Sequence, residues 1–143
     1  RQNANHALRL FDDKLIAALE VSKSKLGQDV EGTIHFISTI SKWWKIVNVK
    51  TPEKGKFKRD AYCDPIFSTT SENLSFLCKF CDWLEKWESL PAPSFVKSTS
   101  RSGKLTRETF FDLLHTTRSL ISITIYLFET VKPLYILLGK FLT

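Results

Sequence analysis

Residues 105–131 read LTRETFFDLLHTTRSLISITIYLFETV, and this stretch decides the fold class. Its apolar residues recur at intervals of three and four, which is the spacing of one buried face of an α-helix. Thr106 is a good capping residue, and Glu108 lies where the helix dipole favours a carboxylate. The run from Ile121 to Ile125 is rich in β-branched residues, so packing against other elements must keep it helical. We therefore expect the central helix of the core here, with these residues inside: Phe110, Leu113, Leu114, Thr117, Leu120, Ile121, Ile125 and Phe128.

Three earlier segments have the same helical period. Residues 6–24 predict a first amphipathic helix, and a second begins at residue 31 and ends before Pro52. Ser71 can cap a third helix that runs from residue 72 to about 88, with Cys78, Cys81 and Trp87 on its inner side. Residues 134–138 fit either a short strand or a further helical turn. The sequence thus predicts an all-α fold, a compact bundle of four or more helices.

Two segments interrupt these helices. Residues 51–70 predict one long basic loop, and a loop of that length is more often functional than not. Residues 94–104 are rich in Ser, with Thr, Arg and Gly, which is the composition of a linker. We therefore divide the 143-residue chain there into residues 1–98 and residues 99–143, which we expect to pack as one unit.

The composition restricts the partners and the compartment. The chain has 21 Lys and Arg against 15 Asp and Glu, and its net charge of +6 favours nucleotide phosphate or nucleic acid as a partner. Three cysteines with no secretory leader favour free thiols in a reducing, intracellular compartment. The longest apolar stretch is shorter than the roughly 20 residues that span a bilayer, so we expect no membrane segment. The chain lacks an initial Met and ends abruptly, which indicates a piece of a longer protein.

Most of the positive charge lies in one segment. Residues 42–62 contain seven Lys or Arg and two acidic residues, which is +5 of the net +6. Ammonium groups and backbone amides near Gly55 make this segment a candidate phosphate site, although a solvated basic loop is the alternative. The clustering and the N-x-K-x-P run indicate these residues around phosphate or base: Lys42, Asn48, Lys50, Lys54 and Lys58, with Asp60 as a base or magnesium contact.

Four aromatic residues are interleaved with these cations, and any exposed ring among them could stack on a nucleobase: Trp43, Trp44, Phe57 and Tyr62. Trp44 lies on the apolar stripe of the second helix, so it is the tryptophan expected in the core. Trp43 points about 100° away from it, and an exposed ring there would suit stacking on a nucleobase. For both rings, however, a position in the core or packing against another helix is the favoured role.

The remaining patterns favour structure over chemistry. Cys78 and Cys81 have CxxC spacing, but they lie inside a helical pattern, and the other residues that could complete a zinc site are scattered. The motifs GxxxxGK[ST], GxSxG, HExxH and GxGxxG do not occur. We therefore predict neither a metal site nor a complete catalytic site, so that this chain alone is not an enzyme.

Three runs, in this order, resemble P element and THAP-type DNA transposases. They are KWWKIVNVKTP at 42–52, LTRETF at 105–110 and LGKFLT at 138–143. The first resembles part of the GTP-binding insertion domain of that family. The other two resemble the place where the chain returns to the RNase H-like catalytic domain. By this resemblance, residues 1–98 are the GTP-binding insertion and residues 99–143 are a helix and a return segment.

The resemblance implies a helical module that binds GTP, alone or with Mg²⁺, and helps to position DNA for strand transfer in the nucleus. Its partners would be GTP, transposon or other DNA, and further domains of the parent protein. The parent would be a DNA transposase or a domesticated derivative. Two alternatives stay open: a helical protein-interaction module that has lost GTP binding, and a sequence-independent DNA-binding domain.

Overall fold

The computed structural model describes residues 13–23, 29–90 and 105–142, and the regular elements in these ranges are helices. In chain order they are α2 (Asp13–Val21), α4 (Asp29–Val47), α5 (Lys54–Lys58), the 3₁₀ turn η2 (Ala61–Cys63), α6 (Glu72–Ser89), α7 (Arg107–Thr130) and the 3₁₀ turn η3 (Leu138–Phe141). The all-α prediction is confirmed. The linker at 94–104 and the part of the first predicted helix before residue 13 lie outside the described residues.

The starts of the two longest C-terminal helices agree with the sequence pattern. The side-chain oxygen of Thr106 caps α7 by accepting the backbone N–H of Thr109 at 3.2 Å. Ser71 occupies the N-cap position of α6, although its side chain makes no capping hydrogen bond. The predicted loop at 51–70 differs more, because it contains α5 and η2. A helix of five residues is too short to produce a recognisable period.

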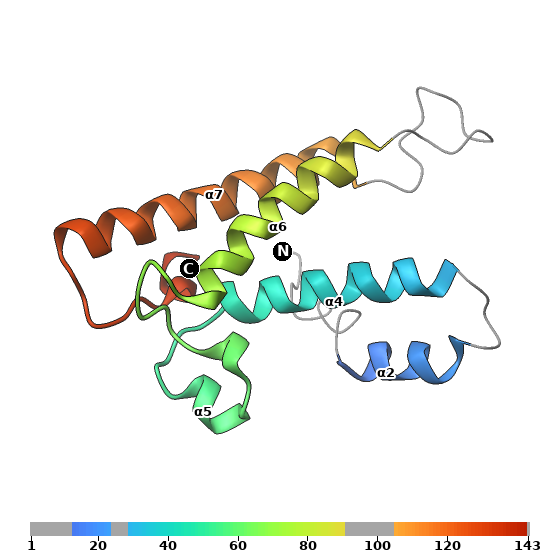
Figure 1. Ribbon diagram of the computed structural model, residues 1–143, viewed down its shortest axis with the longest axis horizontal. Coiled ribbons are helices and arrows are strands. Elements are labelled where there is room, and N and C mark those ends of the chain that lie inside the picture. The colour runs from blue at the N-terminus through green and yellow to red at the C-terminus, as the bar shows by residue number, and fades with distance from the viewer. Residues whose placement is uncertain (1–12, 24–28, 91–104, 143) are drawn as a thin grey trace.

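α6 is the middle element of the fold. It packs along α7 and also contacts α4, while α2 lies along α4 (Figure 1). Trp43 of α4 stacks on Phe80 of α6 with ring centroids 5.7 Å apart, and both side chains are buried. Trp43 also reaches α7, because its indole N–H donates to the hydroxyl of Thr117 at 2.9 Å. The core therefore lies where three helices meet.

The buried faces differ from the predicted ones at three places. α7 is not the centre of the core, because only one of its faces is buried and Ile125 is exposed. Trp43 is buried, whereas Trp44, the expected core residue, is only partly buried. Cys78 is exposed, and Phe80 lies inside instead. Each residue turns a helix by 100°, so an apolar stripe placed one residue off changes which side chain is inside.

The segment after α7 folds back onto the region that follows α4. Ile66 and Ile136 exchange two backbone hydrogen bonds, at 3.0 and 2.8 Å, in an isolated antiparallel bridge. The backbone N–H of Gly139 donates to the carbonyl of Val49 at 2.8 Å. A Cβ at Gly139 would lie 2.7 Å from that carbonyl oxygen, so the close approach requires glycine. Residues 134–138, which fitted strand and helix equally, thus contain one bridge residue and the first residue of η3.

Candidate functional site

The basic segment 42–62 covers the C-terminal end of α4, then α5 and η2, and α5 projects from the rest of the fold (Figure 1). α5 ends at Lys58, and its C-cap Arg59 has a left-handed φ of 53°. This turn lets the backbone N–H groups of Arg59 and Asp60 donate to the carbonyls of Lys56 and Gly55, respectively. Gly55 is buried against Asp64, and a Cβ there would lie 2.9 Å from the Asp64 backbone nitrogen. This contact leaves no room for a side chain, so α5 packs closely against Asp64.

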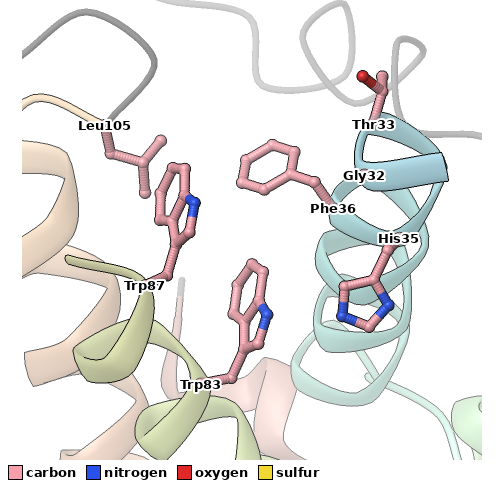
Figure 2. A pocket seen from close by; sticks show the side chains of 7 residues that line it. All are labelled: Gly32, Thr33, His35, Phe36, Trp83, Trp87 and Leu105. Carbon is pink, nitrogen blue, oxygen red and sulfur yellow. The ribbon is translucent and has the colours of Figure 1, made fainter. Parts of the chain in front are cut away.

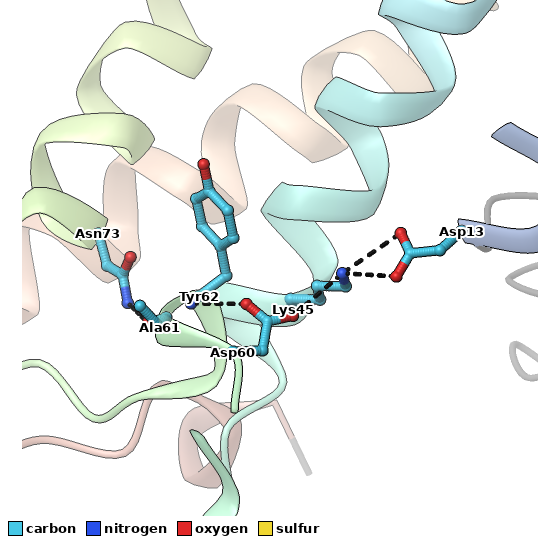
Figure 3. A network of polar contacts seen from close by, with 6 residues as sticks. All are labelled: Asp13, Lys45, Asp60, Ala61, Tyr62 and Asn73. Carbon is cyan, nitrogen blue, oxygen red and sulfur yellow. Dashed lines mark hydrogen bonds and ion pairs between the residues drawn. The ribbon is translucent and has the colours of Figure 1, made fainter. Parts of the chain in front are cut away.

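Lys45 connects three parts of the chain (Figure 3). Its ammonium nitrogen lies 3.1 Å from a carboxylate oxygen of Asp60 and 3.1 Å from one of Asp13 in α2. The other carboxylate oxygen of Asp60 accepts the backbone N–H of Tyr62 at 3.0 Å and so caps η2. Asp60 therefore holds η2 against the last turn of α4.

This network changes the acidity of Lys45. Burial by itself lowers the pKa of Lys45, but the hydrogen bonds and negative charges of Asp60 and Asp13 outweigh it and raise the pKa above its ordinary value. A further bond fastens η2 on its other side, where the side-chain amide of Asn73 donates to the carbonyl of Ala61 at 2.9 Å. The inner side of the basic segment is thus fixed by polar contacts.

Two more cations of the segment are also engaged within the fold. The ammonium nitrogen of Lys42 lies 5.6 Å from the ring centroid of Tyr62, which is a cation–π contact. Lys54 donates to the backbone carbonyl of Asn48 at 3.4 Å and thereby links α5 to the end of α4. These side chains stabilise the segment, and a ligand would have to compete for them.

Four cations face solvent on the outside of the segment. Lys50, Lys56, Lys58 and Arg59 are exposed, and their side chains make no hydrogen bond or ion pair with another described residue. Phe57, between two of these lysines, is 88% exposed. An exposed ring beside ammonium groups can stack on a base while the cations contact phosphates. We call these five residues the outer cationic face.

The six predicted site residues fall into two groups. The first group is partly buried and contributes to the inner contacts: Lys42, Asn48, Lys54 and Asp60. The second group, Lys50 and Lys58, belongs to the outer cationic face. The six predicted residues therefore differ in their surroundings: four make contacts within the fold, and two are exposed to solvent.

Sequence reasoning missed two members of the outer cationic face as ligand contacts, Lys56 and Arg59, although both lie within two positions of the predicted Lys58. Phe57 is one of the interleaved aromatic residues considered for stacking on a base. The available signal was the run KFKR at 56–59, in which cations surround an aromatic residue. Trp43 is not available to stack on a nucleobase at the surface, because its ring is buried.

The three cysteines are free thiols, of which Cys63 and Cys81 are buried and Cys78 is exposed. Burial raises the pKa of the Cys63 and Cys81 thiols, so they stay protonated and unreactive at neutral pH. Among the described residues, no three His, Cys, Asp or Glu side chains converge as a metal site. In the same part of the chain, no helix has the length and apolar character needed to cross a bilayer.

Comparison with known proteins finds no relative: the chain matches no protein-family model, no curated protein and no solved structure. The resemblance to P element transposases therefore stays a prediction from the sequence.

Proposed function

We propose that the chain is a DNA-positioning helical module of a P element-like transposase, or of a domesticated derivative, and that its outer cationic face binds backbone phosphates. The observation that supports this proposal most is the exposure of four cations, none of them paired with a described residue, on and beside α5. Cations that neutralise DNA phosphates release condensed counterions, and this release favours binding independently of sequence. In this proposal the module binds and does not catalyse, and it acts in the nucleus with other domains of the parent protein.

GTP is the second candidate ligand, and Phe57 favours it. A ring that is 88% exposed gives a base a surface on which to stack, while Lys56 and Lys58 can contact the triphosphate. Mg²⁺ would then be carried by the triphosphate and not by a protein site. This candidate and DNA binding use the same face, so one set of variants tests both.

The experiment is a calorimetric titration of the chain with a short DNA duplex, with GTP and with ATP, in the presence of magnesium and at two salt concentrations. Binding through Z phosphates gives a slope of log K against log salt of about −0.9 Z, so four cations predict a slope of about −3 to −4 for the duplex. Lys56→Ala with Lys58→Ala should reduce that slope by about 2 units. The matched control is Lys79→Ala with Lys86→Ala, which removes two exposed lysines from α6 and should leave the slope unchanged.

Each outcome leads to a different conclusion about the ligand of the outer cationic face. Duplex binding that is lost only in the α5 variant supports the DNA proposal. Binding of GTP but not ATP, weakened by Phe57→Ala, supports the nucleotide. Equal losses in the α5 and α6 variants would mean that the net charge, and not the outer cationic face, attracts the anion. No binding of any probe would contradict the proposal and favour a helical module for protein interaction.

A further inference from the structure

A cavity of about 560 Å³ lies between the first turns of α4 and the last turns of α6 (Figure 2). Its walls are aromatic: Phe36 projects from α4 toward Trp83 and Trp87 of α6. The two indole rings are parallel to within 2°, and the ring centroid of Phe36 lies 5.3 Å from that of Trp87. Sites for small molecules have volumes of about 300–1,000 Å³ and mostly apolar walls, and this cavity has both properties.

Gly32 provides a second, independent observation. It lines the cavity from within α4, where glycine is less favourable than alanine because its backbone loses more freedom on folding. At Gly55 and Gly139 a Cβ would collide with neighbouring atoms, so packing explains those two glycines. At Gly32, an exposed position, a Cβ would meet no atom of a described residue within 4 Å. The missing side chain there therefore keeps the entrance of the cavity open.

The lining residues define the chemistry of an occupant. None of the described residues that line the cavity is Lys, Arg, Asp or Glu, so these residues offer a charged molecule no counter-charge. Aromatic walls favour a planar molecule that can pack against them face or edge on. The imidazole of His35 lines one side of the cavity, where it suits one polar substituent.

We propose that this cavity is a binding site for an uncharged, planar aromatic small molecule that carries one hydrogen-bonding group directed toward His35. The site is separate from the outer cationic face. Phe36 precedes Val47, the last residue of α4, by eleven positions, which is about 17 Å along the helix. The proposal therefore does not depend on phosphate binding at α5.

The test uses three probes in calorimetric titrations, with saturation-transfer NMR on the ligand protons. 2-Naphthol is planar and uncharged, 2-naphthalenesulfonate has the same rings with a fixed negative charge, and cyclohexanol is not planar. We expect 2-naphthol to bind, the sulfonate to bind at least about tenfold more weakly, and cyclohexanol to show no saturation transfer. Adding GTP or DNA should leave the affinity for 2-naphthol unchanged.

Variants of Gly32 fill the cavity without removing a contact. Gly32→Leu should weaken 2-naphthol binding at least about tenfold while the Tm stays equal or rises, because leucine favours the helix. Gly32→Ala should give a smaller loss in the same direction, and it carries the test if the larger variant does not fold. Ser122→Leu adds the same side chain to the exposed face of α7 and should bind like the wild type. Absence of 2-naphthol binding at millimolar concentration, tighter binding of the sulfonate, or wild-type affinity in both Gly32 variants would overturn the proposal.

Discussion

Asp60 has two functions in the fold, one for each carboxylate oxygen. One oxygen caps η2 through the backbone N–H of Tyr62, and the other pairs with Lys45. The same ammonium group also pairs with Asp13, but that side chain is 75% exposed, against 24% for Asp60. Solvent therefore screens the pair with Asp13 much more than the pair with Asp60. The contact between Lys45 and Asp60 is the one that holds the inner side of the basic segment.

Substitutions at Asp60 can separate its two functions. Asp60→Ala removes the cap and the ion pair, and we expect it to lower the free energy of unfolding by about 1–2 kcal/mol. Asp60→Asn keeps an oxygen for the N–H of Tyr62, and it should cost about 0.5–1 kcal/mol. Asp13→Ala is the control, with an expected cost near zero. Urea unfolding measures all three variants, and equal costs for Asp60→Ala and Asp13→Ala would contradict this assignment.

The raised pKa of Lys45 sets the pH range in which its ion pair with Asp60 stabilises the fold. A lysine whose pKa is higher in the folded state stabilises the fold fully below its unfolded pKa of about 10.4. That stabilisation is lost as the pH rises through the folded value. The difference between Asp60→Asn and the wild type should therefore be present at about pH 8 and shrink above about pH 10.4.

At the scale of single residues, the sequence located the basic segment but could not show which of its lysines make contacts within the fold. Lys45 and Lys54 are of the same residue type as Lys56 and Lys58, and all four lie within fourteen positions of one another. Lys45 is engaged because Asp60, which follows it in η2's N-cap, and Asp13, 32 positions earlier, both come to lie beside it. Such contacts depend on how η2 and α2 pack against α4, and no local pattern contains that information.

At the scale of the elements, one hydrogen bond joins α4 to α7. The indole N–H of Trp43 donates to Thr117, whose hydroxyl in turn donates to the carbonyl of Leu113 at 2.6 Å. Thr124 makes the same kind of bond to the carbonyl of Leu120 at 2.6 Å. Both threonines are fully buried, and these bonds satisfy their hydroxyl groups.

Trp43→Phe tests the bond between the helices. The phenyl ring retains much of the packing on Phe80, and Thr117 keeps its bond to Leu113, so no hydroxyl group loses all its partners. We expect the free energy of unfolding to fall by about 1–2 kcal/mol, from the lost hydrogen bond and the smaller ring. Trp44→Phe, at a partly buried position, is the matched control and should cost less. Thermal unfolding measures both variants, and identical shifts in Tm would contradict a stabilising role for the hydrogen bond between Trp43 and Thr117.

Helix positions were more predictable than helix faces. The long helices produce a period over many residues and begin at recognisable residues such as Thr106, so their existence and approximate ends follow from the sequence. α7, however, has apolar residues on several sides, including the exposed Phe111, Ile123 and Tyr126. The partner helix decides which side is buried, and the buried face contains the predicted Thr117 but Thr124 instead of Ile125. α5 was missed because Gly55 resembled a loop residue, although it is required for close packing.

At the scale of the whole molecule, Gly139 connects residues that are 90 positions apart in sequence, through its backbone bond to Val49. Gly139→Ala would bring a Cβ to 2.7 Å from the Val49 carbonyl oxygen, and we expect it to lower the free energy of unfolding by about 1–3 kcal/mol. Gly32→Ala makes the same chemical change in open space and should raise that free energy by about 0.5–1 kcal/mol. Chemical denaturation of the two variants checks the opposite signs. A Gly139→Ala variant as stable as the wild type would contradict the prediction and show that the segment around Gly139 can shift away from Val49.

The contact between the C-terminal segment and the residues that follow α4 was not predictable from the sequence. It consists of backbone hydrogen bonds between Gly139 and Val49 and between Ile66 and Ile136, and such bonds leave no mark in the order of side chains. The sequence did indicate that residues 134–138 were ambiguous between strand and helix. The ambiguity was physical, because a single bridge and a 3₁₀ turn provide too few residues for either period.

The same backbone bonds determine how the molecule would respond to tension. A pull on the chain at Leu142 would load the bond between Gly139 and Val49 first, and then the bridge between Ile66 and Ile136. Val49 and Ile66 lie on either side of α5, so the strain would reach the root of the outer cationic face before α7 began to unwind. The C-terminal segment is thus tied by backbone hydrogen bonds to the residues on both sides of α5.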